Sequence, residues 1–168
     1  MLTPDISVRP LTDADRDWVK HFILQHWGAS TVIGHGVTYT PHELPGFVAE
    51  MEGEYVGLLT YQIQGQECEI VSINSTRSGA GIGAGLIETA KRFARKTGCK
   101  RLWLITTNDN MNALRFYQKR GFVLVAVHRD AVTQSRKLKP QIPLLGNDGI
   151  PIRDEIELEM RLGSDQDN

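Results

Sequence analysis

Seven short stretches of the chain either alternate apolar and polar residues or are continuously apolar, and both patterns are typical of β-strands. Turn-forming Gly and Pro residues bound most of these stretches. The predicted strands are residues 6–9, 46–51, 55–63, 67–74, 102–105, 122–127 and 156–162. The run Leu102-Trp103-Leu104-Ile105 has no polar position, so we expect a central strand that is covered on both faces.

Between these stretches the apolar residues recur with the period of about 3.6 that is typical of an amphipathic helix. The predicted helices are residues 12–27, 82–97 and 111–120. Thr12 followed by Asp15 is close to a capping box at the start of the first helix. A glycine follows each helix as a stop signal. Residues 29–45 are interrupted by Gly and Pro and are expected to form a loop, while residues 131–152 begin helix-like and then become rich in Pro and Gly.

The order of these elements predicts the fold class. The second, third and fourth strands are joined by short turns, so they form an antiparallel meander. The helix 82–97 links the fourth and fifth strands by a right-handed crossover, which makes these two strands parallel. We therefore expect an α/β (α+β) fold with a mixed central sheet of about seven strands and helices on both faces. Residues 1–163 are expected to form a single domain, and residues 164–168 a frayed tail.

Composition and charge narrow the possible functions. The 19 basic and 20 acidic residues nearly cancel and form no basic run, which disfavours nucleic acid and membrane surfaces as partners. The N-terminus lacks a signal-peptide pattern, and no apolar run approaches the roughly 20 residues that span a bilayer, so we expect a cytoplasmic protein. Cys68 and Cys99 both begin predicted strands and could lie near each other, but the default expectation is two reduced, packed thiols.

The most distinctive local feature is the glycine-rich turn 78–86, Ser-Gly-Ala-Gly-Ile-Gly-Ala-Gly-Leu, which lies between a strand and a helix. Such a turn exposes backbone N–H groups at the positive end of a helix dipole, so a diphosphate is its natural ligand. A plain flexible turn is the alternative. The turn is not a P-loop, because no Gly-Lys-Ser/Thr follows it.

A dinucleotide site is also disfavoured. Gly79, Gly81 and Ala84 satisfy the loose fingerprint, but that motif normally follows the first strand of a parallel domain and precedes an acidic residue by about 20 positions. Here a meander comes first, and the corresponding position falls on Cys99-Lys100-Arg101.

The turn resembles the signature of the GNAT superfamily of acetyltransferases, Gln/Arg-x-x-Gly-x-Gly/Ala, with Gly81 and Gly83 at its two small positions. Ser78 occupies the Gln/Arg position, with Arg77 one residue upstream, so a side-chain contact is in doubt while a backbone contact should survive. The resemblance implies that the turn holds the pyrophosphate of CoA through Ser78, Gly79, Ala80, Gly81, Ile82, Gly83 and Ala84. It also implies that Val71, Ser72 and Ile73 pair with pantetheine, where the fourth and fifth strands splay apart to hold CoA.

A second block, residues 110–122, resembles the family's Asn-…-Ala-…-Tyr-…-Gly-Phe segment in content and spacing. Asn110 and Tyr117 are seven residues apart, about two helical turns, so they face the same side. The resemblance implies that Asn110 contributes to the cofactor site and that Tyr117 is the acid that protonates the leaving thiolate. A core aromatic residue is the ordinary alternative for Tyr117.

The reaction that the resemblance implies is direct transfer of the acetyl group from acetyl-CoA to a bound amine. Two carboxylates are candidates for the base of this reaction. Glu69 matches a carboxylate that many family members use, but Glu67 lies on the same strand, and even spacing would place both on one face with Val71 and Ile73. A solvated face is the alternative for this pair. His35, His42 and His128 are scattered singly, so no metal site is predicted.

The predicted function is therefore an acetyl-CoA-dependent N-acetyltransferase that acts on a primary amine of a small molecule or peptide. A non-catalytic acyl-CoA-binding module and an acyltransferase for longer acyl chains remain open. Homodimers are common among proteins of this resemblance. In such proteins the acceptor approaches from the side opposite to CoA, so residues 29–45 and 128–154 are expected to bind it.

Overall fold

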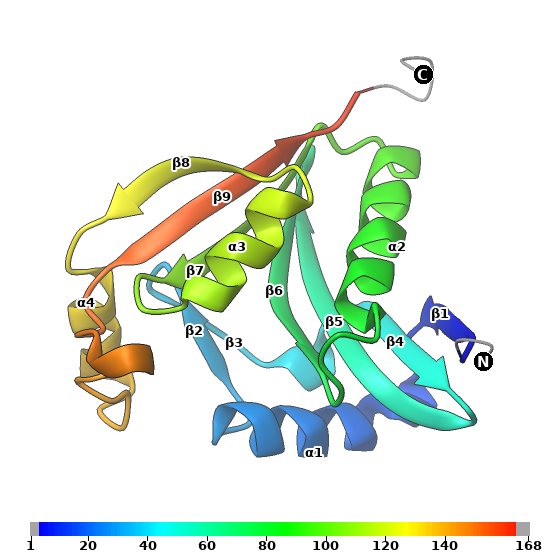
Figure 1. Cartoon of the computed structure of the whole chain (residues 1–168), viewed down its shortest axis with the longest axis horizontal. Helices are drawn as coiled ribbons and strands as arrows, with labels where there is room; N and C mark the ends of the chain where they lie inside the picture. Colours follow the sequence, from blue (N-terminus) through cyan, green and yellow to red (C-terminus); the bar gives the residue numbers. More distant parts are fainter. Residues whose placement is uncertain (1–3, 164–168) are drawn as a thin grey trace.

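The computed structural model describes residues 4–163, so the expected tail at 164–168 lies outside the described residues. Seven strands form one mixed sheet with the spatial order β1-β4-β5-β6-β7-β9-β8 (Figure 1). They are β1 (Ile6–Pro10), β4 (Gly46–Met51), β5 (Glu54–Gln64), β6 (Glu67–Ser75), β7 (Arg101–Thr107), β8 (Val123–His128) and β9 (Glu155–Arg161). Strands β4, β5 and β6 are an antiparallel meander and β6 pairs in parallel with β7, which confirms the predicted topology.

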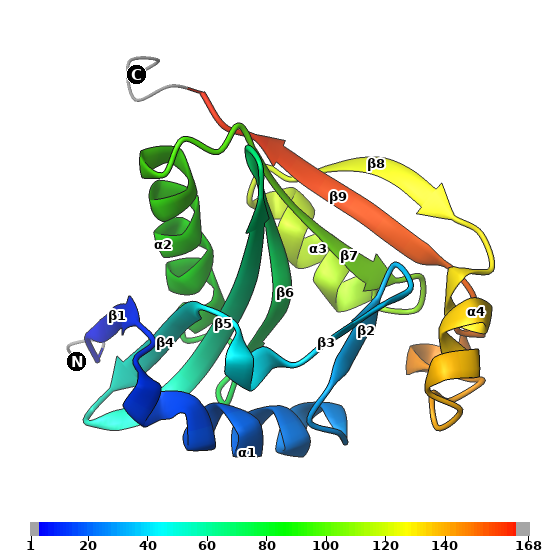
Figure 2. The same cartoon turned by 180° about the vertical axis from the view of Figure 1, so that it is seen from behind.

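Helices cover both faces of this sheet, as the sequence predicted. They are α1 (Arg16–Trp27), α2 (Ile82–Lys96), α3 (Met111–Lys119) and α4 (Ala131–Leu138). Helices α2 and α3 lie on one face, and α1 lies on the other (Figures 1 and 2). Short 3₁₀ turns complete the chain at η1 (Asp13–Asp15), η2 (Pro41–Glu43) and η3 (Asn147–Gly149).

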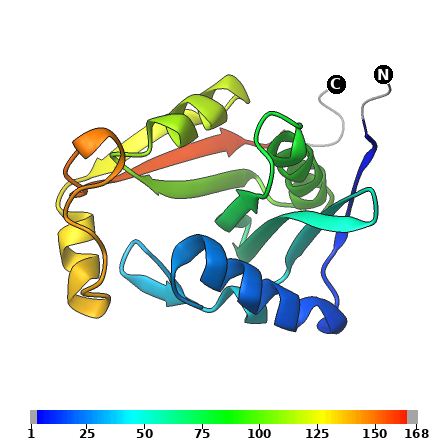
Figure 3. The same cartoon turned by 60° about the horizontal axis from the view of Figure 1, so that its bottom comes forward.

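The segment 29–45 contains a β-hairpin, so the prediction that it forms only a loop was wrong. Strands β2 (Val32–Gly34) and β3 (Val37–Tyr39) pair antiparallel around a two-residue turn. His35 and Gly36 form this turn with φ of 40° and 79°, the positive values that tight hairpin turns require. Strands of three residues are too short to show a periodic pattern. The sequence therefore showed only Gly34 and Gly36, which are typical of a loop. The hairpin and α4 lie at the same end of the molecule (Figures 2 and 3).

The core has one part on each face of the sheet. The larger cluster packs α2 and α3 on the sheet and includes Leu86, Leu102, Leu104 and Leu158. The smaller cluster packs α1 on the opposite face and consists of Val19, Phe22, Ile23, Val32 and Leu58.

Strand β7 is covered less completely than its apolar sequence predicted. Leu102 and Leu104 are buried in the larger core, but Trp103 and Ile105 on the other face are only half-buried. Trp103 packs against His35 of the β2–β3 hairpin, with ring centroids 5.4 Å apart. A short hairpin covers less area than a helix, so this face of β7 stays partly open.

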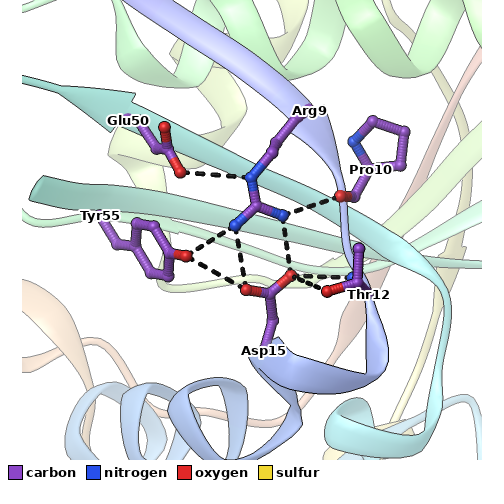
Figure 4. A network of polar contacts seen from close by, with 6 residues as sticks. All are labelled: Arg9, Pro10, Thr12, Asp15, Glu50 and Tyr55. Carbon is purple, nitrogen blue, oxygen red and sulfur yellow. Dashed lines mark hydrogen bonds and ion pairs between the residues drawn. The ribbon is translucent and has the colours of Figure 1, made fainter. Parts of the chain in front are cut away.

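A polar network joins the start of α1 to the edge of the sheet (Figure 4). The Arg9 guanidinium donates two hydrogen bonds to Asp15, at 2.8 and 3.0 Å, and further bonds to Tyr55 and Glu50. The backbone N–H of Thr12 also donates to Asp15 at 2.8 Å, as in the predicted capping box. Asp15 is only 4% exposed. The hydrogen bonds from Arg9 hold the pKa of Asp15 well below its usual range, although burial acts in the opposite direction.

Candidate active site

The site begins where the two central parallel strands separate. Strands β6 and β7 pair only from Glu67 opposite Arg101 to Ile70 opposite Leu104, although both strands continue beyond that point. Their ends diverge in Figure 1. Opposite β5, Thr60 pairs with Ser72 and Tyr61 pairs with Ile70, so a β-bulge leaves Val71 without a partner. The backbone of Val71 is thus free of ladder pairing at the point of separation.

The bulge also reverses the side-chain alternation along β6. The sequence predicted that Glu69, Val71 and Ile73 share one face, and this was wrong for Ile73. Val71 packs against the α1-side core, while Ile73 packs against the α2-side core. One extra residue in a strand moves every later side chain to the opposite face.

A cleft of about 260 Å³ lies between the separated strands. Its lining includes five residues that the sequence assigned to the site, namely Val71, Ser72, Ile73, Asn110 and Tyr117. Asn110 is the N-cap of α3, and its side chain accepts the N–H of Ala113 at 3.1 Å. Tyr117 is 7% exposed, and burial raises the pKa of its phenol, so it stays protonated at neutral pH.

Residues 78–81 of the glycine-rich turn are exposed and lie just before α2, whereas residues 82–86 form the first turn of that helix, with Ile82 and Leu86 buried. None of them lines this cleft. Gly79 and Gly81 have φ of 75° and 80°, a conformation that L side chains rarely adopt. The first turn of α2 carries no acidic residue, so its positive dipole end is not neutralised. A Cβ at Gly83 would lie 3.0 Å from the Phe116 ring, so this glycine also allows α2 and α3 to pack closely.

A larger cavity of about 750 Å³ adjoins the cleft and shares Val71, Ile105 and Asn110 with it. Both irregular segments that the sequence assigned to acceptor binding contribute to its lining. The hairpin segment supplies Val32, Ile33, Gly34 and Tyr39, and the segment after β8 supplies Val132, Ser135, Lys139, Gln141, Ile142, Pro143 and Ile152. The cavity therefore lies next to the cleft and brings both segments together.

Glu69 lies in the lining of this cavity and is 8% exposed. Its Oε2 accepts the hydroxyl of Tyr39 at 2.8 Å, and its Oε1 lies 2.9 Å from Nε2 of His35. Because an ionised carboxylate only accepts, the proton of this pair is on His35 Nε2. Burial and the neighbouring Glu69 raise the pKa of Tyr39, which keeps its hydroxyl a donor.

Glu67 has a different environment, although it is only two residues away. It is exposed and lies 3.5 Å from Arg101 in an ion pair. The sequence could not distinguish the two glutamates, and it did not assign His35 or Tyr39 to the site. His35 is a single histidine in a segment predicted to be a loop, so only its position at the hairpin turn reveals its partner.

Residues 4–163 do not support a reactive thiol or a metal ion as part of this site. Cys68 and Cys99 are free and buried, and burial raises the pKa of Cys68 to about 12, which makes it a poor nucleophile at neutral pH. Within residues 4–163, no group of three or more His, Cys, Asp or Glu side chains is arranged to hold a metal ion.

The helices in the same range are too short or too polar to cross a membrane.

Comparisons with known proteins agree with this geometry. Residues 11–122 match a family model described as the acetyltransferase (GNAT) family. The uncharacterized protein YdhI of Bacillus subtilis is 42% identical over 148 residues, which cover 88% of this chain and 92% of YdhI. The structure of an IAA acetyltransferase from Bacillus cereus superposes with a TM-score of 0.72 at 22% identity, over 94% of this chain and 100% of that chain. A GNAT family acetyltransferase from Elizabethkingia anophelis with acetyl-CoA bound has a TM-score of 0.65 at 22% identity, over 94% and 98% of the two chains. The chain belongs to the GNAT family of acetyltransferases.

Proposed function

We propose that this acetyltransferase transfers the acetyl group of acetyl-CoA directly to a primary amine of a small molecule or peptide. The observation that carries the proposal is the junction of the cleft and the larger cavity, beside which Glu69 is buried. One opening suits a thioester between the separated strands, and the other suits an amine that approaches from the opposite side. A direct transfer needs both molecules bound at once with their reacting atoms in contact.

Acetyl-CoA binding has support from two regions of the chain. The turn from Ser78 to Ala84 offers backbone N–H groups at the start of the 15-residue helix α2, which suits the pyrophosphate. Val71, Ser72 and Ile73 border the cleft and suit the pantetheine arm. The acetyl-CoA bound in the Elizabethkingia anophelis relative of the same fold supports the same co-substrate.

Glu69 is the proposed base. An alkyl ammonium has a free pKa near ~10.4, so at neutral pH it must lose a proton before its nitrogen can attack the thioester. Tyr39 and His35 each donate to one oxygen of Glu69 and hold the carboxylate in place at the cavity wall. Each carboxylate oxygen keeps a further lone pair for the amine, directly or through a water.

Val71 and Tyr117 suit the two remaining tasks. The thioester carbonyl becomes an oxyanion on attack, and the backbone N–H of Val71, which has no register partner in β5, is the proposed donor to it. The thiolate leaves more readily when an acid protonates it. Tyr117 borders the same cleft with its hydroxyl protonated, and it is the proposed acid.

The test is a screen of small amines and peptides with acetyl-CoA, read by release of the CoA thiol and by mass spectrometry of the product. The proposal requires turnover with at least one primary amine and loss of turnover in Glu69→Gln. Binding of acetyl-CoA without turnover on a broad panel would instead indicate a CoA-binding module. A clear preference for a longer acyl-CoA would indicate a different donor.

A further inference from the structure

Glu155, the first residue of β9, is a buried carboxylate with one unused oxygen. It lies opposite Thr107 of β7, lines the larger cavity and is 4% exposed. Its Oε2 accepts the backbone N–H of His35 at 3.0 Å. Its Oε1 is shielded from solvent and has no hydrogen-bond partner among residues 4–163. A buried carboxylate oxygen without a partner is costly, so a donor that enters the cavity gains a strong interaction there.

The other two carboxylates of the cavity lining differ from Glu155 in this respect. Asp109 accepts the hydroxyl of Thr107 on one oxygen at 2.6 Å and the backbone N–H of Asn147 on the other at 3.0 Å. Glu69 accepts from His35 and Tyr39, one donor on each oxygen. Asp109 and Glu69 are therefore held by the protein itself, while half of Glu155 is left for a ligand.

The charge of the cavity shows which kind of ligand suits it. Glu69, Asp109 and Glu155 face one lysine, Lys139, and one histidine, His26, in the lining. Lys139 donates to the carbonyl of Thr31 at 3.4 Å, so its charge is already directed to another partner. Three carboxylates against one lysine and one histidine leave the lining with an excess of negative charge.

Further glutamates lie on the sheet surface beside Glu155, but basic side chains pair with them. Glu157 and Glu159 follow Glu155 on the same face of β9, and Glu67 lies on β6. Arg101 contacts all three of these glutamates, and Arg161 also lies 3.3 Å from Glu159. The excess of negative charge that favours a cationic ligand therefore lies in the cavity lining.

We propose that the acceptor is a small diamine, a molecule with a second protonated amine, and that the Glu155 carboxylate rotates to bring Oε1 to this second ammonium and binds it. This inference rests on the proposed function. The reacting amine faces Glu69, and His35 links the two carboxylates because its backbone N–H contacts Glu155 and its ring contacts Glu69. The spacing of the two anionic sites is thus set by one residue, held at a φ of 40°. A cavity of about 750 Å³ has the size of a small-molecule site.

The first test needs only the wild-type protein. A series of α,ω-diaminoalkanes is compared with the monoamines of equal chain length, with kcat and KM measured for each. A buried charged hydrogen bond predicts a kcat/KM that is about tenfold to a hundredfold higher for the best diamine. Equal values for diamines and monoamines would overturn the inference while leaving the proposed function intact.

The second test uses Glu155→Gln, which keeps a carbonyl oxygen for the N–H of His35. The expected result is a rise of about tenfold or more in the KM of the diamine, which clearly exceeds any change in the KM of the monoamine of equal chain length. The control is Glu159→Gln, because Glu159 lies on the same face of β9 but outside the cavity lining. This variant should change the kinetics of neither the diamine nor the monoamine. A fall in kcat on both substrates with a changed pH profile would contradict the inference, because Glu155 would then take part in proton transfer.

Calorimetric titration of diamines into the protein with CoA separates the two proposals. Binding that depends on Glu155, without any acetyl transfer, supports the diamine site and contradicts the proposed function. Turnover of monoamines without binding of diamines supports the proposed function and contradicts the diamine site. If Glu155→Gln does not fold, as judged by its melting curve, the wild-type comparison of diamines and monoamines still decides.

Discussion

His35 and Glu69 lie 34 positions apart in the sequence, yet Nε2 of the histidine is 2.9 Å from Oε1 of the glutamate. The contact brings the turn of the β2–β3 hairpin onto strand β6 at the wall of the larger cavity. Tyr39, from the same hairpin, donates to the other oxygen of Glu69 at 2.8 Å. The hairpin therefore both closes the cavity and orients the carboxylate that we propose as the base.

Tyr39→Phe tests this orienting role. Loss of one donor to a buried carboxylate should reduce kcat about tenfold while acetyl-CoA binding stays unchanged. Steady-state kinetics and calorimetric titration of acetyl-CoA measure the two effects. Tyr61→Phe is a matched control, because Tyr61 is equally buried but belongs to the core on the other face of the sheet. Equal losses in both variants would mean that packing explains the effect.

Glu69→Gln should lower turnover about a hundredfold or more near neutral pH, as is typical when a general base is removed. The loss should shrink as the pH rises toward the ~10.4 of a free alkyl amine, since the neutral nucleophile then forms without help. Glu67→Gln, two residues away on the same strand but exposed, should leave the pH–rate profile unchanged. If the two variants exchange these behaviours, Glu67 is the base.

Tyr117→Phe should reduce kcat about a hundredfold and leave the affinity for acetyl-CoA nearly unchanged, because only a proton donor is removed. Burial raises the pKa of Tyr117, so in the wild type this donor remains available throughout the neutral range and is lost only in strongly alkaline solution. Rates and binding are measured on the same preparations. Unchanged single-turnover rates would assign Tyr117 to packing.

Acetyl-CoA at about a hundred times its dissociation constant should stabilise the wild type by about 2.7 kcal/mol, seen as a higher Tm. Gly81→Asp should abolish this gain, because it places a negative charge at the turn that we propose for the pyrophosphate. Gly53→Asp is the control: its φ is also 80° and its Cβ would also have room, but it lies in the β4–β5 turn. An undiminished shift in Gly81→Asp would place the phosphates elsewhere.

Asp15→Asn should reduce the free energy of unfolding at pH 7 by about 1–3 kcal/mol, because it weakens the charged hydrogen bonds with Arg9. The folded-state pKa of Asp15 is lowered, so its contribution is fully present above the unfolded value of about 3.9 and is lost as the pH falls toward the folded value. Urea unfolding of both proteins measures this difference as a function of pH. A difference in unfolding free energy that stays constant down to strongly acidic solution would contradict the lowered pKa of Asp15.

The sequence by itself determined the strands of the main sheet, the helices that cover it and their order along the chain, although it missed the β2–β3 hairpin. Alternation along β9 and the 3.6-residue period of α2 reflect which side chains face the core, and such patterns are local along the chain. The short turns and the crossover through α2 then determined the antiparallel meander from β4 to β6 and the parallel pairing of β6 with β7. The insertion of β9 between β7 and β8 was not predicted. Motif spacing in the sequence also singled out Tyr117, Asn110 and Val71, which line the cleft, and their roles stay a prediction.

The tertiary structure alone decided which side chains meet in the cavity. The bulge at Val71 arises from pairing with β5, and it moved Ile73 to the face that strict alternation excludes. The resemblance favoured Glu69 but left Glu67 open, and the hairpin distinguishes the two because it covers only Glu69. Glu155 contacts His35 across 120 positions, and no local pattern records such a contact. Periodicity encodes whether a residue is buried, whereas its partner depends on how distant segments pack.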